Sequence, residues 1–361
     1  MKRNSRNRSI GVGQSLLSAA LLFFPPALAA GASVLTIPVF GVGMRIYKPI
    51  AITVTLLCLT TIFALIATFV NAGLMDEAIE SLKFLFMAFC LVSGFWLQAK
   101  LKDIQRLALI LSTALVVWYT VSVQLGVALP DAFRPPDNNG SSILLFFLAF
   151  ILTDNRNIFG RLIIIAFLGF FATLVDSRLL IVLLPLFFLS QPVSFSIGRV
   201  LLFVCLCIVV YIVTLGFGLW GNWSDFVRLE IYATTLRHFL QEGLVLIATG
   251  QGPFLEAINA SLPDIISQRL ELSHVHNAFF QVIGSYGLLP GLSFIGVFVV
   301  LTRTSIILSD DTVRNQTIFL ISAMMIETLL SDSRIAYIAF LFIGLQIGAA
   351  RRRNAERLAL T

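Results

Sequence analysis

The sequence predicts an all-α, polytopic membrane protein, in which a bundle of about twelve transmembrane helices carries one long loop. Hydrophobic residues make up 58% of the 361 residues, charged residues make up 12%, and the mean hydropathy is +0.94. A soluble globular domain carries about twice that share of charged residues. Apolar runs such as 162–175 and 200–216 are continuous, whereas the strands of an outer-membrane barrel alternate apolar and polar residues. The spans are therefore predicted to be helices.

A membrane-spanning helix needs about 20 apolar residues, with about 17 as a practical lower limit. The N-terminal half of the chain contains predicted spans at 10–25, 28–44, 50–72, 82–99, 107–129 and 141–154. The C-terminal half contains predicted spans at 161–176, 178–192, 200–219, 277–301, 315–331 and 335–350. The first pair is open to two other interpretations, because 10–44 could be one long helix or include a cleavable signal peptide. The apolar run continues to Met44, beyond the length of a signal peptide, and Pro25-Pro26 would turn a hairpin.

The orientation follows from the basic residues. Both ends of the chain are strongly basic, so both are expected in the cytoplasm, which requires an even number of spans and favours the hairpin. The same assignment leaves most lysines and arginines in cytoplasmic segments and most acids outside. A few basic side chains remain on the outer face, where a bound anion would explain them: Lys83, Arg134, Arg178, Arg228, Arg237, Arg269 and Arg334.

Residues 220–276 form the one long stretch that a lipid bilayer would reject, and they contain all three histidines of the chain. We treat 1–361 as a single membrane domain and 220–276 as a periplasmic loop with amphipathic helices inserted in it, between spans 9 and 10. One amphipathic helix is predicted over 225–242. A second is predicted over 253–270, whole or broken at Pro263, either lying in the membrane interface or simply packing over the bundle.

Arg178 stands in Val175-Asp-Ser-Arg178, between two apolar runs that leave no room for a loop. It is therefore expected at a helix end, at or just inside the membrane surface. A charge at this depth costs on the order of a few kcal/mol, which makes a functional role the first hypothesis. Snorkelling to the lipid headgroups or pairing with Asp176 is the structural alternative.

Arg228 and Arg237 both belong to the predicted helix 225–242. Nine positions at about 100° each place them on nearly opposite faces, so at most one points into a shared site. Arg228 has Tyr232 along its face, whereas Arg237 is flanked by His238 and Glu242 and is expected to be more solvated. Arg228, supported by Tyr232, is the preferred candidate, and an ordinary helix-surface charge is the alternative.

His276 is the candidate general base. It stands where the predicted span 277–301 opens, with Asn277 directly after it. An imidazole near several arginines has a reduced tendency to protonate, which suits removal of a proton from a sugar hydroxyl. A helix cap or a hydrogen-bonding spacer is the alternative role. His274, about half a helical turn away, is a supporting candidate, and His238 is expected to be solvated.

Arg334, in Ser331-Asp-Ser-Arg334, and Glu327 in the preceding span also lie toward the outer side. We expect them to form a structural pair, with a place in the site as the alternative.

The composition argues against several other classes. The basic residues occur in small groups between apolar runs, as topogenic charges do, so nucleic-acid binding is not expected. The cysteines fall inside apolar spans, where a thiol acts as a small hydrophobe, and predict neither a disulfide nor a metal site. The sequence contains no Asp-x-Asp pair, no Walker A loop, no His-Glu-x-x-His and no Cys-x-x-Cys.

Several short motifs follow one another along the chain: Asp176-Ser-Arg178 at a span start, Arg228 with an aromatic residue four positions on, Gly250-Gln-Gly252-Pro-Phe254, and His276-Asn277 followed by Gly287-Leu-Leu-Pro-Gly291. In this combination the chain resembles the bacterial O-antigen ligase and polysaccharide polymerase superfamily, over roughly residues 160–300. The ten-residue spacing between His276 and Gly287 and the arginine of Asp176-Ser-Arg178 carry most of the resemblance.

The resemblance implies a glycosyltransferase of the bacterial inner membrane whose active site faces the periplasm. It would transfer a glycan from an undecaprenyl-diphosphate donor to an acceptor hydroxyl, without a metal or other cofactor. Arg178 and Arg228 would bind the diphosphate through bidentate contacts and stabilise its leaving charge, and His276 would deprotonate the acceptor. Asn277, His274, Tyr232 and Arg334 would be supporting residues.

Two alternatives remain at this stage. Within the superfamily, a ligase transfers a finished glycan to lipid A core, whereas a polymerase joins lipid-linked repeat units of O-antigen or exopolysaccharide. From a different class, a transporter or flippase of lipid-linked glycans would carry ionisable residues near the middle of the membrane in two repeated halves, and no such repeat is visible.

Overall fold

A computed structural model describes residues 47–71, 75–97, 99–126, 138–153, 223–251, 254–267, 277–326 and 332–359, together with scattered single residues, and all regular structure in these ranges is helical. Its first half contains α3 (Lys48–Val70), α4 (Met75–Ser81), α5 (Lys83–Leu97), α6 (Leu101–Tyr119), the π-helix η1 (Thr120–Gln124) and α7 (Asn138–Thr153). Its second half contains α11 (Trp223–Thr249), α12 (Phe254–Ser261), α13 (Asp264–Ser267), α14 (Ala278–Tyr286), α15 (Leu288–Leu308), α16 (Asp311–Ile326) and α17 (Ser333–Leu358).

The described part of the chain contains five helices that are long and apolar enough to cross a membrane: Lys48–Val70, Ala78–Leu97, Leu101–Ser122, Leu288–Leu308 and Ser333–Leu358. They confirm the prediction of a helical, multi-pass membrane protein. The spans predicted at 10–25, 28–44, 161–176, 178–192 and 200–219 lie wholly or largely outside the described residues. A total of about twelve spans therefore stays a prediction.

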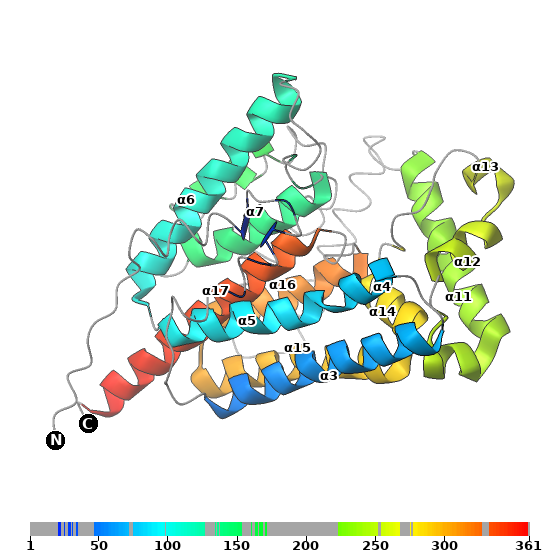
Figure 1. Ribbon diagram of the computed structural model, residues 1–361. Helices are drawn as coiled ribbons and strands as arrows, with labels where there is room; N and C mark the ends of the chain where they lie inside the picture. The colour runs from blue at the N-terminus through cyan, green and yellow to red at the C-terminus, as the bar shows by residue number, and fades with distance from the viewer. Residues whose placement is uncertain are drawn as a thin grey trace, which may run out of the picture.

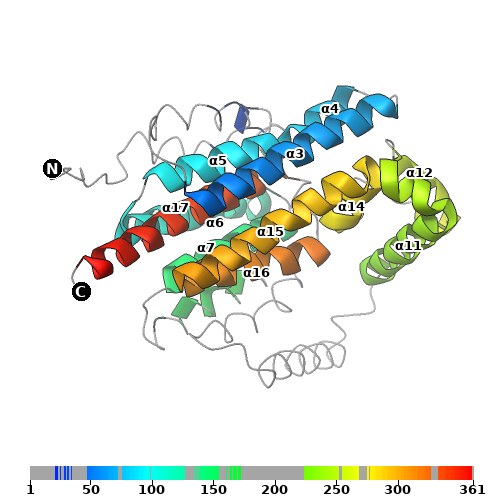
Figure 2. The same cartoon turned by 90° about the horizontal axis from the view of Figure 1, so that it is seen from below.

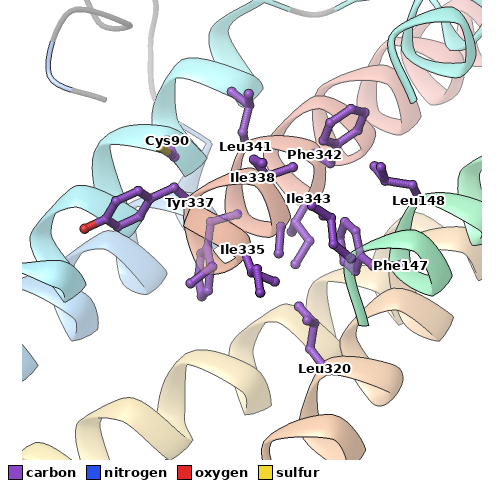
Figure 3. Close-up of a cluster of buried hydrophobic side chains, with 14 of the residues drawn as sticks. Cys90, Phe147, Leu148, Leu320, Ile335, Tyr337, Ile338, Leu341, Phe342 and Ile343 are labelled. Carbon is purple, nitrogen blue, oxygen red and sulfur yellow. The ribbon is translucent and has the colours of Figure 1, made fainter. Parts of the chain in front are cut away.

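Helix α17 is the centre of the bundle. Every residue from Ser333 to Ala350 is buried, and the helix contacts α5, α6, α7, α15 and α16 (Figures 1 and 2). Figure 3 shows the surrounding side chains, with Phe147 and Leu148 of α7 and Leu320 of α16 beside Ile338 and Ile343 of α17. Because lipid is as apolar as these side chains, close packing holds such a centre together in a membrane, rather than exclusion from water.

Glycines set the closest contact in the bundle, between α5 and α17. A Cβ atom on Gly94 would overlap the carbonyl of Leu341, and one on Gly344 would overlap the carbonyl of Leu91. Gly344 and Gly348 form the Gly-x-x-x-Gly spacing that lets two membrane helices approach backbone to backbone. A side chain at Gly94 or Gly344 would force the two helices apart.

The predicted span 277–301 is wrong as a single helix. The chain reverses at Gly287, whose φ of 92° is accessible to glycine but strained for other residues, and α14 folds back against α15. In one straight helix, Phe279 and Phe294 would be separated by about 22 Å, at 1.5 Å per residue. Their ring centroids are 5.9 Å apart, and Phe279 also lies 6.0 Å from Phe298.

The long loop is helical and has a small core of its own. Helix α11 is interrupted at Gly243 (φ 66°, ψ −150°), so its first part ends at Glu242, where the predicted helix 225–242 ends. The second predicted segment is broken at Pro263 into α12 and α13. Phe254 and Ile258 of α12 are fully buried against α11, which favours packing as the role of this apolar face.

Helices α11 to α13 lie at one end of the bundle, and the basic C-terminal end of α17 lies at the other (Figures 1 and 2). The predicted topology requires this relative placement. Which end faces the cytoplasm stays a prediction.

Candidate functional site

The structure describes Arg228, Tyr232, Asn277 and Arg334 among the predicted site residues. His276, His274 and Arg178 lie outside the described residues, as do Arg269 and Glu327. Arg228 is thus the described member of the predicted diphosphate-binding pair, and Tyr232, Asn277 and Arg334 are described among the supporting residues.

Arg228 and Tyr232 occupy one side of α11, a single turn apart. The helix buries Val227, Ile231 and Thr235 against its neighbours, and Arg228 lies half-buried beside them. The preference for Arg228 over Arg237 fits this arrangement. Arg237 is solvated, with 59% of its side chain exposed, and its Nη2 is 3.0 Å from Oε1 of Glu230 rather than pairing with Glu242.

Tyr232 and Asn277 meet at one acceptor, the backbone carbonyl of Met325. The Tyr232 hydroxyl donates to this oxygen at 3.2 Å, and Nδ2 of Asn277 donates to it at 3.2 Å. Carbonyls in the last turn of a helix lack an intrahelical partner, and Met325 stands at the C-terminal end of α16. We call Tyr232, Asn277 and this carbonyl the Met325 junction; it ties the loop helix α11 and the α14–α15 hairpin to the bundle.

Asn277 has a second structural role. It is the N-cap of α14, and its Oδ1 accepts a hydrogen bond from the Phe280 N–H at 3.0 Å. Both ends of its amide are therefore engaged, one in starting the helix and one in the Met325 junction. Asn277 directly follows His276 in the sequence, so the junction holds the chain neighbour of the predicted general base.

The Gly-x-Gly motif docks the loop on the hairpin corner. A Cβ on Gly250 (φ 72°) would lie 2.6 Å from the Ser285 carbonyl oxygen, and one on Gly287 would lie 2.5 Å from the Ala248 carbonyl oxygen. The Gln251 N–H donates to the Gly284 carbonyl at 2.9 Å. Two motifs that stand far apart in the sequence, around Gly250 and Gly287, thus serve one contact.

His238 is not solvated, contrary to expectation. It is only 8% exposed, its Nε2 lies 2.6 Å from Oε1 of Gln251, and its ring centroid is 6.0 Å from that of Phe254. The imidazole therefore helps to hold Gln251 and Phe254 against α11. Its charged neighbours in the sequence gave no sign of this, because both contacts come from residues beyond the end of the helix.

The described end of α3 reaches the same corner. Nδ2 of Asn71, the C-cap of α3, donates to the Thr249 carbonyl at 3.2 Å. The loop is thus fixed to the bundle at two places, the Met325 junction and this corner.

Arg334 has a structural environment. The guanidinium forms an ion pair with Asp332, with Nη2 2.5 Å from Oδ2, and Nη1 donates to the Arg134 carbonyl at 3.1 Å. It also lies over the ring of Trp118, 5.7 Å from the centroid, and the residue is 5% exposed. The expected structural pair therefore has Asp332 as its acid; the expected partner Glu327 lies outside the described residues.

Several of the basic residues predicted on the outer face form ion pairs within the protein. Besides Arg334 with Asp332, Lys83 forms an ion pair with Glu80, and Arg237 pairs with Glu230. These three have acidic partners within the protein, so a bound anion is not needed to explain them.

An apolar groove runs along α15, between α14 and α16. Its volume is about 660 Å³, and its lining is apolar apart from Asn277, Thr302 and Arg303. Within the described ranges, no group of histidine, cysteine and acidic side chains is placed to hold a metal ion.

No known family model matches this chain. A comparison with curated proteins likewise finds no match.

Proposed function

We propose that the protein is a glycosyltransferase of the bacterial inner membrane that transfers a glycan from an undecaprenyl-diphosphate donor to an acceptor hydroxyl. The acceptor we propose is the lipid A core, which makes the protein an O-antigen ligase. The proposal rests first on the motifs at Arg178, Arg228, Gly250 and His276. The structural observation that supports it most is the Met325 junction, where Tyr232, one turn from Arg228, and Asn277, next to His276 in sequence, share one acceptor.

In the proposed reaction the acceptor oxygen attacks the anomeric carbon of the donor sugar. A new C–O bond forms, the bond between that carbon and the diphosphate oxygen breaks, and the diphosphate leaves with the bonding electrons. His276 would take the proton of the acceptor hydroxyl. Arg178 and Arg228 would bind the diphosphate and stabilise its growing negative charge, which is the largest electrostatic change in the reaction.

The transporter alternative gains no support from the described residues. Charged side chains of the bundle, such as Arg334 and Asp310, are paired with Asp332 and Arg353 near helix ends. The fully buried polar side chains that stand inside helices α16 and α17 are Gln316, Thr317 and Gln346, and none of them is ionisable. A transporter that couples substrate movement to protons or ions would need such groups.

The test uses the full-length protein in detergent or nanodiscs, with a synthetic undecaprenyl-diphosphate glycan and purified lipid A core. We expect His276→Ala to lower the transfer rate by at least about 100-fold, and Arg178→Ala and Arg228→Ala by about 100-fold each. Arg237→Ala is the matched control on α11, and we expect it to stay within about two-fold of the unchanged protein because Arg237 is a solvated surface residue. Full activity of His276→Ala would remove that residue from the mechanism.

Deletion of the gene separates the ligase from the polymerase. A ligase deletion leaves long polymer on its lipid carrier and an uncapped core, whereas a polymerase deletion leaves single repeat units attached to the core. Absence of any transfer by the unchanged protein with either acceptor would argue against both and favour transport.

A further inference from the structure

The groove along α15 has one charged side chain, and it stands in an apolar setting. Arg303 is exposed at the groove, and its helix neighbours Val299, Ile306 and Ile307 are 62%, 65% and 57% exposed. Exposed aliphatic side chains on a membrane helix face lipid. A guanidinium among them must reach the headgroups or meet an anion, because leaving it unpaired in hydrocarbon costs several kcal/mol.

The protein itself does not supply that anion within the described ranges. The two carboxylates of the adjoining α15–α16 turn are both taken by other arginines: Asp310 pairs with Arg353 at 2.5 Å, and Asp311 pairs with Arg314 at 2.7 Å. No described carboxylate lies within ion-pair distance of Arg303. Among the described residues, no carboxylate occupies the donors of this guanidinium.

The rest of the groove offers hydrocarbon contacts. Phe280 and Ile283 of α14, Ile295 and Val299 of α15, and Ile321 of α16 line its walls. The amide of Asn277 is engaged by the Met325 carbonyl and the Phe280 N–H, so it does not compete for a ligand. Figure 2 shows α14, α15 and α16 side by side on one side of the bundle.

The length of the groove fits one leaflet of a bilayer. Ile295 and Ile306 both line it, and eleven residues of helix at 1.5 Å each separate them by about 16 Å. Half of the hydrocarbon core of a bilayer is about 15 Å thick. Arg303 stands eight residues from Ile295, about 12 Å along the helix at 1.5 Å per residue, so the acyl chain of a lipid whose phosphate contacts Arg303 would cover most of this length.

We propose that this groove binds an anionic phospholipid, with the lipid phosphate on the Arg303 guanidinium and an acyl chain between α14, α15 and α16. Guanidinium groups bind phosphate oxygens through two parallel hydrogen bonds, whereas the ammonium of a zwitterionic headgroup opposes this contact. The bound chain packs against α14, the helix whose N-cap is part of the Met325 junction. This proposal does not depend on glycosyl transfer, and the two can fail separately.

Native mass spectrometry of the purified full-length protein tests the proposal, with dioleoylphosphatidylglycerol as the probe and dioleoylphosphatidylcholine as the zwitterionic control. We expect phosphatidylglycerol to bind about five-fold more tightly than phosphatidylcholine, which is the effect of one exposed ion pair. Arg303→Gln should remove this preference. Arg106→Gln is the matched control, because Arg106 is also an exposed helix arginine but has Asp103 at 3.9 Å, and it should keep the preference.

A second variant probes the chain rather than the headgroup. Val299→Trp adds a ring to an exposed groove position and should weaken both lipids while leaving the melting temperature unchanged within error. An undiminished preference in Arg303→Gln would overturn the proposal. So would displacement of phosphatidylglycerol by millimolar inorganic phosphate, or by an equal concentration of undecaprenyl phosphate, which would assign the groove to a different ligand.

Discussion

The Met325 junction makes a prediction that separates the two roles of Asn277. Asn277→Ser keeps an oxygen that can cap α14 but is too short to reach the Met325 carbonyl, whereas Asn277→Ala removes both contacts. A single hydrogen bond contributes about 1 kcal/mol, and a lost N-cap costs about 1 kcal/mol. We therefore expect Asn277→Ser to destabilise the protein by about 1 kcal/mol and Asn277→Ala by about 2 kcal/mol.

Tyr232→Phe removes the other donor to the same oxygen. Alone it should cost about 1 kcal/mol or less, because Asn277 still satisfies the carbonyl. In the double variant Tyr232→Phe/Asn277→Ser the carbonyl loses both donors, and a buried or lipid-exposed polar group without a partner costs about 1–3 kcal/mol. The double variant should therefore be less stable than the sum of the two single changes, by about 0.5 kcal/mol or more.

Reversible unfolding of the purified protein in mixed micelles, titrated with a denaturing detergent, measures the four stabilities of this cycle. Strict additivity within about 0.3 kcal/mol would mean that the two side chains do not share an acceptor, and the junction would be refuted. Glycosyl transfer measured on the same four proteins then shows whether the junction also positions the reactive groups.

Other positions give sharper tests of the fold. Gly287→Ala should destabilise the protein by about 2–5 kcal/mol, because it adds backbone strain and its Cβ overlaps the Ala248 carbonyl. Gly243→Ala is the control with a similar φ but no atom within 4 Å, and it should cost about 1 kcal/mol. Equal effects of the two changes would contradict the close contact at the corner. Gly94→Ala should cost about 1–3 kcal/mol of stability, because its Cβ meets the Leu341 backbone. Gly296→Ala should cost clearly less, since its Cβ meets only the flexible methyl groups of Leu56, the nearer at 3.3 Å. Thermal unfolding compares the two variants, and the reverse order would disprove the α5–α17 contact. Arg334→Gln should destabilise the protein by about 3–5 kcal/mol, because it leaves the Asp332 carboxylate without its ion-pair partner. The transfer rate per folded molecule should not change, and a selective loss of transfer would instead assign Arg334 a role in the active site.

The local signals in the loop predicted only part of its helices, because the continuation of α11 beyond Gly243 to Thr249 was not expected. The first helix was predicted to end at Glu242, directly before Gly243, and a break at Pro263 was one of the two forms left open for the second segment. Helical periodicity placed Arg228 and Arg237 on nearly opposite faces, their sequence neighbours gave the preference for Arg228, and its role in binding stays a prediction. Features of this kind are encoded within one or two turns of chain.

The reversal at Gly287 was missed because hydropathy counts apolar residues and takes no account of direction. Residues 277–301 are apolar on both sides of the corner, so they satisfy the length criterion of one span while forming two helices. The sequence did hold a signal, since Gly287, Pro290 and Gly291 stand close together and glycine and proline mark turns even in apolar runs. The burial of His238 had no comparable signal, because Gln251 and Phe254 reach it only once the chain has turned.

The reversal also alters where Asn277, a supporting residue of the predicted site, lies. If 277–301 were one helix, Asn277 would stand at the membrane edge. Instead α14 leads back from the corner for nine residues, about 13 Å at 1.5 Å per residue, and places Phe279 beside Phe298 in the middle of α15. Asn277 is buried there against the end of α16. Water is scarcer at such a position, so an ionic contact made there would be stronger than one at a surface. The folded-back helix, which the sequence pattern concealed, thus moves Asn277 from the expected membrane edge to a buried position inside the bundle.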